Sequence, residues 1–347
     1  MKARVITIAC LILALSLTAA GIASCTWFDR QTQQPADKTN DINTLLIRPE
    51  GWQTLDLSAE FSERDIAQID GSTATIPITA ELLRQFCGQS DRTIQNNLIV
   101  FHSTTHNAYT QLIDRGTRHI YNNYDGYGEQ TDGSVPVNLI LVTPPSEEEK
   151  QYAKDRGVEL ELTPVARDGF AFIVNRANRV DSLTVEQIQD IYTGKITNWS
   201  RVGGSDRAIK AYQRNANSGS QTAMEQLVMQ GKPMMKPPST KQIGAMGMLI
   251  EAVAAEYDNG QGSIGYSYYY YLNNLYKNDH VKVLKVNGVT PDNENLISGA
   301  YPFSTSYYAV IRADEPADSP ARRLRDFLIS EDGQRLVEQA GYCRGVD

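Results

Sequence analysis

A single arginine precedes a serine- and glycine-rich turn in the segment QRNANSGSQTAMEQLVMQGKP, residues 213–233. Arg214 stands four positions before Ser218, and Gly219 and Ser220 follow directly. If a helix begins at this turn, its first backbone N–H groups have no partner inside the helix and lie at the positive end of the helix dipole. Such an end favours an anion, and a guanidinium adds a bidentate fork. The residue types therefore suit an oxyanion site, although an ordinary helix cap is the commoner use of the same residues.

The residues after the turn support a helix there. Met224, Leu227 and Val228 recur at helical spacing, and Gly231 and Pro233 are residues that end a helix. The alternative is that Thr222 and Glu225 form an ordinary T-x-x-E capping box and that the arginine is a solvated charge.

The first residues of the chain predict an export signal rather than part of a folded domain. Lys2 and Arg4 precede an apolar run over 5–23, which ends in small residues before Cys25. The sequence IASC resembles the lipobox of bacterial lipoproteins, which implies that Cys25 is lipidated. An uncleaved membrane helix is disfavoured because the run is short and lacks a charged flank. We expect a signal peptide at 1–24, a lipid anchor and tether at 25–65, and an extracytoplasmic body held on the cell membrane, or on an outer membrane.

Charge and cysteine content restrict the class of protein further. The formal net charge is −8, and removal of the two basic residues of the signal would make it −10. This balance argues against nucleic acid as a partner and means that an anion must be captured by local geometry. Cys87 and Cys343 could form a disulfide or remain two separate buried thiols.

Alternating apolar runs and helical patterns indicate an α/β protein with a largely parallel sheet. We expect strands at DIAQI (65–69), NNLIVF (96–101), VNLILV (137–142), GFAFIVN (169–175) and YPFSTSYYAVI (301–311). We expect helices at 77–86, 107–113 and 146–157, a helix with a Thr184/Gln187 capping box that ends at Gly194, and a helical region over 321–341. Residues 115–134 look like a loop-like insertion, and the tyrosines of 265–276 are expected to pack an element edge.

Several phrases resemble, in order and spacing, the phosphate-binding proteins of bacterial phosphate ABC importers, a branch of the type II periplasmic-binding-protein fold. They are DGSTATIP, LILVTPPSEEEKQYAKDRGVELELTPVARDGFAFIVN, LTVEQIQDIYTGKITNWSRVGG, YQRNANSGSQTAM, IGYS and GYCRGVD. The resemblance covers nearly all of residues 66–347. It implies two α/β lobes joined by two crossing hinge strands, with lobe one at 66–170 plus 306–347 and lobe two at 171–305.

The resemblance also implies a ligand set and a partner. It places inorganic phosphate in the cleft between the lobes and implies delivery to the permease subunits of an ABC importer. The matching positions are Thr73, the backbone N–H of Ala74, Thr105, Thr143, Arg214, Ser218, Gly219 and Ser220. Where many members have an aspartate that accepts a phosphate proton, this chain has Thr143, which imposes no charge penalty on a fully deprotonated oxyanion.

Other chemistries find less support in the residues. The NSGSQ segment lacks the glycine of a G-x-S-x-G elbow before Ser218 and has no nearby histidine, so we expect no enzyme. His102 and His106 have i, i+4 spacing, but no Glu or Cys completes a metal set, and His119 falls in the insertion, so we expect loop or surface histidines, no metal and no cofactor. The alternative function is an oxyanion-binding lipoprotein for sensing or adhesion that is not coupled to a transporter.

Overall fold

The computed structural model describes residues 51–95, 98–119, 133–237, 242–255 and 261–346. Cys25, the signal peptide and most of the expected tether therefore lie outside the described residues. Within the described ranges, no helix is both long and apolar enough to cross a membrane.

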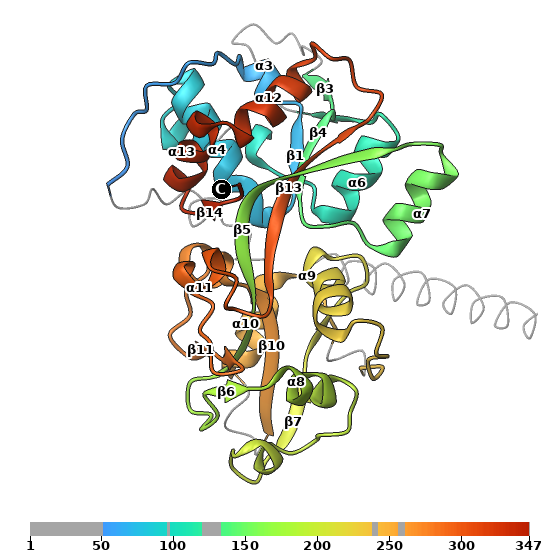
Figure 1. Ribbon diagram of the computed structural model, residues 1–347, viewed down its shortest axis with the longest axis vertical. Coiled ribbons are helices and arrows are strands. Elements are labelled where there is room, and N and C mark those ends of the chain that lie inside the picture. The colour runs from blue at the N-terminus through green and yellow to red at the C-terminus, as the bar shows by residue number, and fades with distance from the viewer. Residues whose placement is uncertain (1–50, 96–97, 120–132, 238–241, 256–260, 347) are drawn as a thin grey trace, which may run out of the picture. The chain divides into compact units, whose positions relative to one another are not determined.

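One long strand, β5 (Leu160–Asn175), belongs to two halves of the sheet in turn. From Leu160 to Gly169 it pairs with β13 (Ser304–Arg312), and from Phe170 to Asn175 it pairs with β10 (Gln261–Tyr268) and β11 (Val281–Val283). The exchange of partners divides the molecule into two lobes, and β5 and β13 lie side by side where the chain crosses between them (Figure 1).

The first lobe is built on β1 (Ile69–Gly71), which runs parallel to β4 (Leu139–Val142), with β13 beyond β4. Its described α-helices are α3 (Glu63–Ile66), α4 (Ile76–Cys87), α5 (Asp91–Gln95), α6 (Thr105–Ile113), α7 (Glu147–Asp155), α12 (Pro320–Ile329) and α13 (Glu331–Gln339). A short terminal strand, β14 (Cys343–Arg344), pairs with the other edge of β5. Buried side chains of α6 pack against β4, and α4 is buried along most of its length.

The second lobe is built on β10, which runs parallel to β7 (Ala208–Ala211). Its main helices are α8 (Val185–Tyr192), α9 (Gly219–Ala223), α10 (Met246–Ala255) and α11 (Asn293–Ile297). The α9 helix continues without a break into a π-helical stretch, η5 (Met224–Met229), which ends at Gln230 in the left-handed region. The sheet is mixed rather than largely parallel, because both hinge strands run antiparallel to their neighbours.

Most expected elements form, and the exceptions have local causes. The capping box of Thr184 and Gln187 is present at the start of α8, and the helix ends before Gly194, whose φ is +82°. The run at 65–69 is only partly a strand, because Ser62 and Asp65 form a capping box that starts α3. The expected strand at 96–101 is a 3₁₀ turn, η3 (Leu98–Val100), in its described part.

The inserted segment is not wholly a loop. Its ends pair as an antiparallel hairpin of β2 (Thr117–His119) and β3 (Ser134–Pro136), while residues 120–132 lie outside the described residues. The tyrosine-rich run packs as expected, since Tyr266, Tyr268 and Tyr271 are buried in β10 and the π-helical turn η7 (Tyr271–Leu275). Cys87 and Cys343 are both free thiols, so the disulfide alternative is wrong.

A buried carboxyl group lies in the hinge. Asp168 of β5 is 1% exposed. Its Oδ1 accepts hydrogen bonds from the backbone N–H groups of Gly169 (2.7 Å) and Tyr270 (2.9 Å), and its Oδ2 accepts one from the Tyr307 hydroxyl at 2.9 Å. Burial raises the pKa of Asp168 from 3.8 to about 7, although these hydrogen bonds act in the opposite direction.

The native state therefore holds a proton on Asp168 where the unfolded chain has lost it, so stability falls as the pH rises from about 4 to about 7. We expect Asp168→Asn to remove this loss, because the amide does not titrate; its oxygen can accept the two backbone N–H bonds, and its NH2 can donate to the Tyr307 oxygen. Relative to the variant, wild type should lose about 2 to 4 kcal/mol of unfolding free energy between these pH values, measured by urea denaturation. The exposed Asp318→Asn serves as control, and parallel pH curves for wild type and Asp168→Asn would contradict the assignment.

Candidate functional site

The first-lobe candidates follow the ends of two parallel strands. Thr73 opens a 3₁₀ turn, η2 (Thr73–Thr75), directly after β1, and Thr143 follows β4. Because β1 and β4 are parallel neighbours, their carboxyl ends meet at the same edge of the sheet. Thr105 is the first residue of α6, behind Thr104, whose φ is +83°. Thr105 and Thr143 are buried, and Thr73 is half-buried.

The second-lobe candidates gather at the start of α9. Ser218 is the N-cap and its side chain accepts a hydrogen bond from the Gln221 N–H, so the Thr222/Glu225 capping box is not what begins this helix. Arg214 lies in the two-residue strand β8 (Gln213–Arg214) and is 7% exposed. Its guanidinium donates to the Gly244 carbonyl at 2.8 Å and to the Ser220 hydroxyl at 3.4 Å. The arginine is therefore a buried group aimed at the helix start and not a solvated charge.

The two sets meet at Gly219. A Cβ placed on Gly219 would lie 2.5 Å from Thr143 Oγ1 and 3.0 Å from Thr105 Oγ1. Only a residue without a side chain allows this approach of the second lobe to the first. The structure thus brings Thr105, Thr143 and Gly219 together. Arg214 and Ser220 are joined to each other by a hydrogen bond at the first turn of α9. Thr73 and Ala74 are linked to this group through the pairing of β1 with β4.

Two further contacts join the lobes beside this group. Asn217 donates to the Glu148 carboxylate at 2.6 Å, and Gln226 donates to the Pro145 carbonyl at 3.0 Å. Both first-lobe partners lie at or just before α7; of the second-lobe donors, Asn217 precedes α9 and Gln226 lies in η5, which continues α9. The structure therefore shows the two lobes closed against each other on this side.

Three residues that the sequence did not single out hold the site in place. Gln221 Oε1 and the Tyr266 hydroxyl both accept from the Arg214 backbone N–H, at 3.1 and 2.9 Å. Tyr268 donates to the Gly219 carbonyl at 3.0 Å. The only signal for the tyrosines was the patch at 265–276, and its alternating side chains could have been placed only once β10 was known to run beside α9.

Burial shapes the chemistry of these groups. It raises the pKa of Tyr268, and the nearby Thr143 hydroxyl partly offsets that effect. Thr143 Oγ1 itself is buried and has no hydrogen-bond partner of normal geometry within the described residues. A buried hydroxyl without a well-placed partner is costly, so Thr143 Oγ1 gains from any further group that reaches it, a water molecule included.

The histidines take structural roles. The His102 ring lies within hydrogen-bonding distance of the Ser72 carbonyl and the Thr79 hydroxyl, at 2.9 and 3.0 Å, and burial lowers its pKa to about 4. His106 lies on α6 rather than in a loop and contacts Glu149 at 3.0 Å. No group of three His, Cys, Asp or Glu side chains suited to a metal ion occurs in the part of the chain that the structure describes.

The orphan hydroxyl of Thr143 gives a stability test. We expect Thr143→Val to raise the unfolding free energy of the ligand-free protein by about 1 to 2 kcal/mol, because the valine removes an unsatisfied polar group without changing shape. Thr75→Val is the matched control: Thr75 Oγ1 lies 2.7 Å from the Leu141 carbonyl oxygen and 2.9 Å from that of Ser72, so this change should destabilise. A Thr143→Val protein that loses as much as Thr75→Val, measured by urea denaturation, would show that Thr143 is satisfied after all.

Comparison with known proteins places the chain in a family. A model described as a PBP superfamily domain matches residues 102–332. The phosphate-binding protein PstS of Borreliella burgdorferi is 25% identical over 280 residues, which cover 80% of this chain and 89% of that protein. The protein of the same name from Bacillus subtilis is 28% identical over 184 residues, but the chain spans only 57% of its length and the match covers 53% of this chain.

Solved structures agree on the fold. A putative phosphate ABC transporter substrate-binding protein from Clostridium perfringens, solved with bound phosphate, is 25% identical with a TM-score of 0.56, covering 80% of this chain and 98% of that one. An ABC-type phosphate transport receptor from Vibrio cholerae is 24% identical and has a TM-score of 0.54. The match covers 79% of this chain and 98% of that one. The chain belongs to the PBP superfamily and has the two-lobed type II fold of a periplasmic binding protein.

Proposed function

We propose that the protein captures inorganic phosphate in the cleft between its lobes and delivers it to an ABC importer. The observation that carries this proposal is the convergence of two buried threonine hydroxyls, one of them unpaired, on the glycine at the start of α9. The names of the relatives support the same ligand, since PstS proteins and the phosphate-bound neighbour are named for it.

The chemistry of the site suits a tetrahedral oxyanion. Hydroxyl groups, helix N–H groups and one guanidinium are all donors, and they come from both lobes. The proposed ligand set is Thr73, the backbone N–H of Ala74, Thr105, Thr143, Arg214, Ser218, Gly219 and Ser220. Since the chain as a whole carries a formal charge of −8, long-range attraction cannot supply the affinity, and these short-range donors must. We assign a binding role and not a catalytic one to this set.

Thr143 sets the selectivity in this proposal. A carboxylate at this position would accept a proton from phosphate and repel sulfate, whereas a hydroxyl can donate to either anion. We therefore expect weaker discrimination between phosphate and sulfate than a carboxylate would give. The alternative function, an oxyanion-binding protein for sensing or adhesion without a transporter, would use the same site, and genes for a permease and an ATPase beside this one would distinguish the two.

The lobes move as units in this proposal, with lobe one at 66–170 plus 306–347 and lobe two at 171–305. The exchange of β5 partners between Gly169 and Phe170 supports the first boundary. A ligand held by donors from both lobes favours the closed arrangement, because an open cleft offers it only half of its contacts. A closed, loaded protein is the form expected to engage the permease subunits.

The role of Arg214 can be measured directly. We expect Arg214→Ala to weaken phosphate binding by about 2 to 5 kcal/mol, because the bound anion is then buried without its cationic partner. Arg201→Ala, an exposed arginine on the same lobe, is the control and should bind as wild type does. Calorimetry with phosphate and then sulfate, together with a thermal melt of each variant, provides the measurement. Wild-type affinity in a folded Arg214→Ala protein would refute the proposed ligand set.

We also propose that Cys25 carries a lipid that anchors the protein to the extracytoplasmic side of the cell membrane. The support is the small-residue sequence before Cys25 and the polar, irregular composition of 26–50, which suits a tether.

Cys25→Ala should leave the protein unprocessed or release it from the membrane fraction, because no other cysteine follows an export signal. Cys87→Ala, in the folded body, is the control and should stay anchored. Fractionation and fatty-acid labelling are the measurements. Undiminished labelling of Cys25→Ala would place the lipid at another residue.

A further inference from the structure

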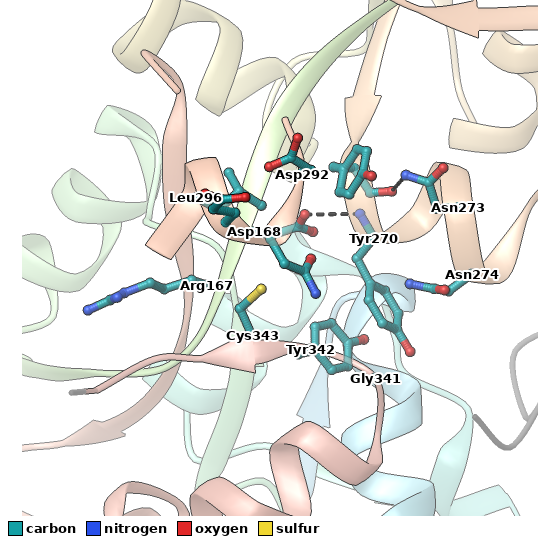
Figure 2. A pocket seen from close by; sticks show the side chains of 13 residues that line it. Arg167, Asp168, Tyr270, Asn273, Asn274, Asp292, Leu296, Gly341, Tyr342 and Cys343 are labelled. Carbon is teal, nitrogen blue, oxygen red and sulfur yellow. Dashed lines mark hydrogen bonds between the residues drawn. The ribbon is translucent and has the colours of Figure 1, made fainter. Parts of the chain in front are cut away.

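A cavity of about 510 Å³ lies at the hinge, away from the group around Gly219. Figure 2 shows its lining residues around Asp168. In the first lobe the strands run in the order β14, β5, β13, β4, so the cavity at Cys343 of β14 lies on one edge of β5. Thr143, which follows β4, lies beyond the other edge. Figure 1 shows the same separation, with β14 and α11 on one side of the crossing strands and α9 on the other.

Both lobes build the walls of this cavity. Gly341, Tyr342 and Cys343 come from the first lobe, and the segments 269–274 and 292–296 come from the second. Asp168 of the hinge strand lies between them. The volume falls in the range of ordinary small-molecule pockets, roughly 300 to 1,000 Å³.

Two carboxylates and three amides make up much of the polar lining of the cavity. The carboxylates are those of Asp292 and Glu294 and the amides are those of 273, 274 and 293, whereas Asp168 holds its proton near neutral pH and already accepts three hydrogen bonds from the protein. Arg167 is the one cationic side chain in the lining, and its guanidinium extends away from the other labelled residues (Figure 2). The pKa of Tyr269 is raised by burial first, and the charge of Asp292 adds to that effect, so this carboxylate lies near a group of the cavity lining.

The carboxylates are not arranged for a single metal ion. No trio of His, Cys, Asp or Glu side chains in the described ranges could hold one. A cation that extends over several atoms can instead meet separate carboxylates and amides with separate N–H donors, while its carbon chain packs on Tyr269 and Leu296.

We propose that this hinge cavity binds a small organic cation of the aliphatic diamine class, and that its occupancy favours closure of the cleft at Gly219. The coupling follows from position. The hinge strands lie between the two sites, so a rotation that draws Gly219 away from Thr143 brings α11 toward β14 and narrows the cavity. A cation that fills the cavity opposes this rotation. The coupling rests on the proposed phosphate binding, whereas cation binding does not.

Putrescine titrated into the full-length, phosphate-free protein by calorimetry tests the site. We expect saturable binding, and a loss of about tenfold or more in affinity in Asp292→Asn/Glu294→Gln. Asparagine retains the helix-capping bond that Asp292 accepts from the Asn295 N–H, so this variant removes charge and not structure. The charge-matched control is Glu186→Gln/Asp318→Asn, which alters two exposed carboxylates outside the cavity lining. An absence of saturable binding, or an equal loss in both double variants, would overturn the site.

The coupling is tested by phosphate titrations with and without saturating putrescine, and with 1,4-butanediol as the uncharged analogue. We expect putrescine to raise phosphate affinity about fivefold, and phosphate to raise putrescine affinity by the same factor, because linkage is reciprocal. Independent binding of the two ligands would overturn the coupling. Phosphate binding without putrescine binding would overturn the cavity proposal alone, and putrescine binding without phosphate binding would overturn the proposed function while the cation site stands.

Discussion

The architecture depends on a single strand, β5, that pairs in both halves of the main sheet. β5 pairs with β13 up to Gly169 and with β10 and β11 from Phe170 onward, so its hydrogen bonds hold both lobes at once. No side chain contact between the lobes is needed to keep them together, which leaves the faces on either side of the hinge available for ligands. The exchange point is also where Asp168 is buried, with its two oxygens bonded to groups from both lobes and from the second hinge strand.

Several polar groups in this protein are placed where they cost stability. Thr143 Oγ1 is buried without a normal partner, and Asp168 is a carboxyl group buried so deeply that it holds its proton near neutral pH. Both lie at points where the lobes meet or the chain crosses between them. Buried polar groups of this kind are expected at functional sites, because a bound ligand or a movement of the lobes can supply the hydrogen bond or charge that the ligand-free structure lacks. The proposed anion site and the hinge cavity differ in their lining: the first is lined by donors, and much of the polar lining of the second consists of carboxylates and amides.

Local sequence patterns predicted the helices better than the strands. Capping residues act within four residues, so Thr184 starts α8 as expected whatever surrounds it, and Ser146 does the same for α7, where a helix but no cap was predicted. The short apolar runs near 65 and 96 were ambiguous because the same residues suit a strand or a buried turn. Near 65, the capping box at Ser62 starts a helix in place of the first part of the expected strand. The hairpin that closes the insertion at Thr117 depends on pairing between strands, which no local pattern reveals.

The sequence by itself determined the kind of site: a guanidinium, hydroxyls and a glycine at a helix start are donors for an oxyanion wherever they are placed. It also determined the order of the elements, through spacing and caps. Only the tertiary structure decided which residues meet. Thr105 and Thr143 approach Gly219 across the two lobes, and Tyr266 and Tyr268 support that helix from β10, because strands distant in the chain are brought together by β5. The hinge cavity also exists only in the tertiary structure, because its walls come from separate parts of the chain that meet only after both lobes have formed.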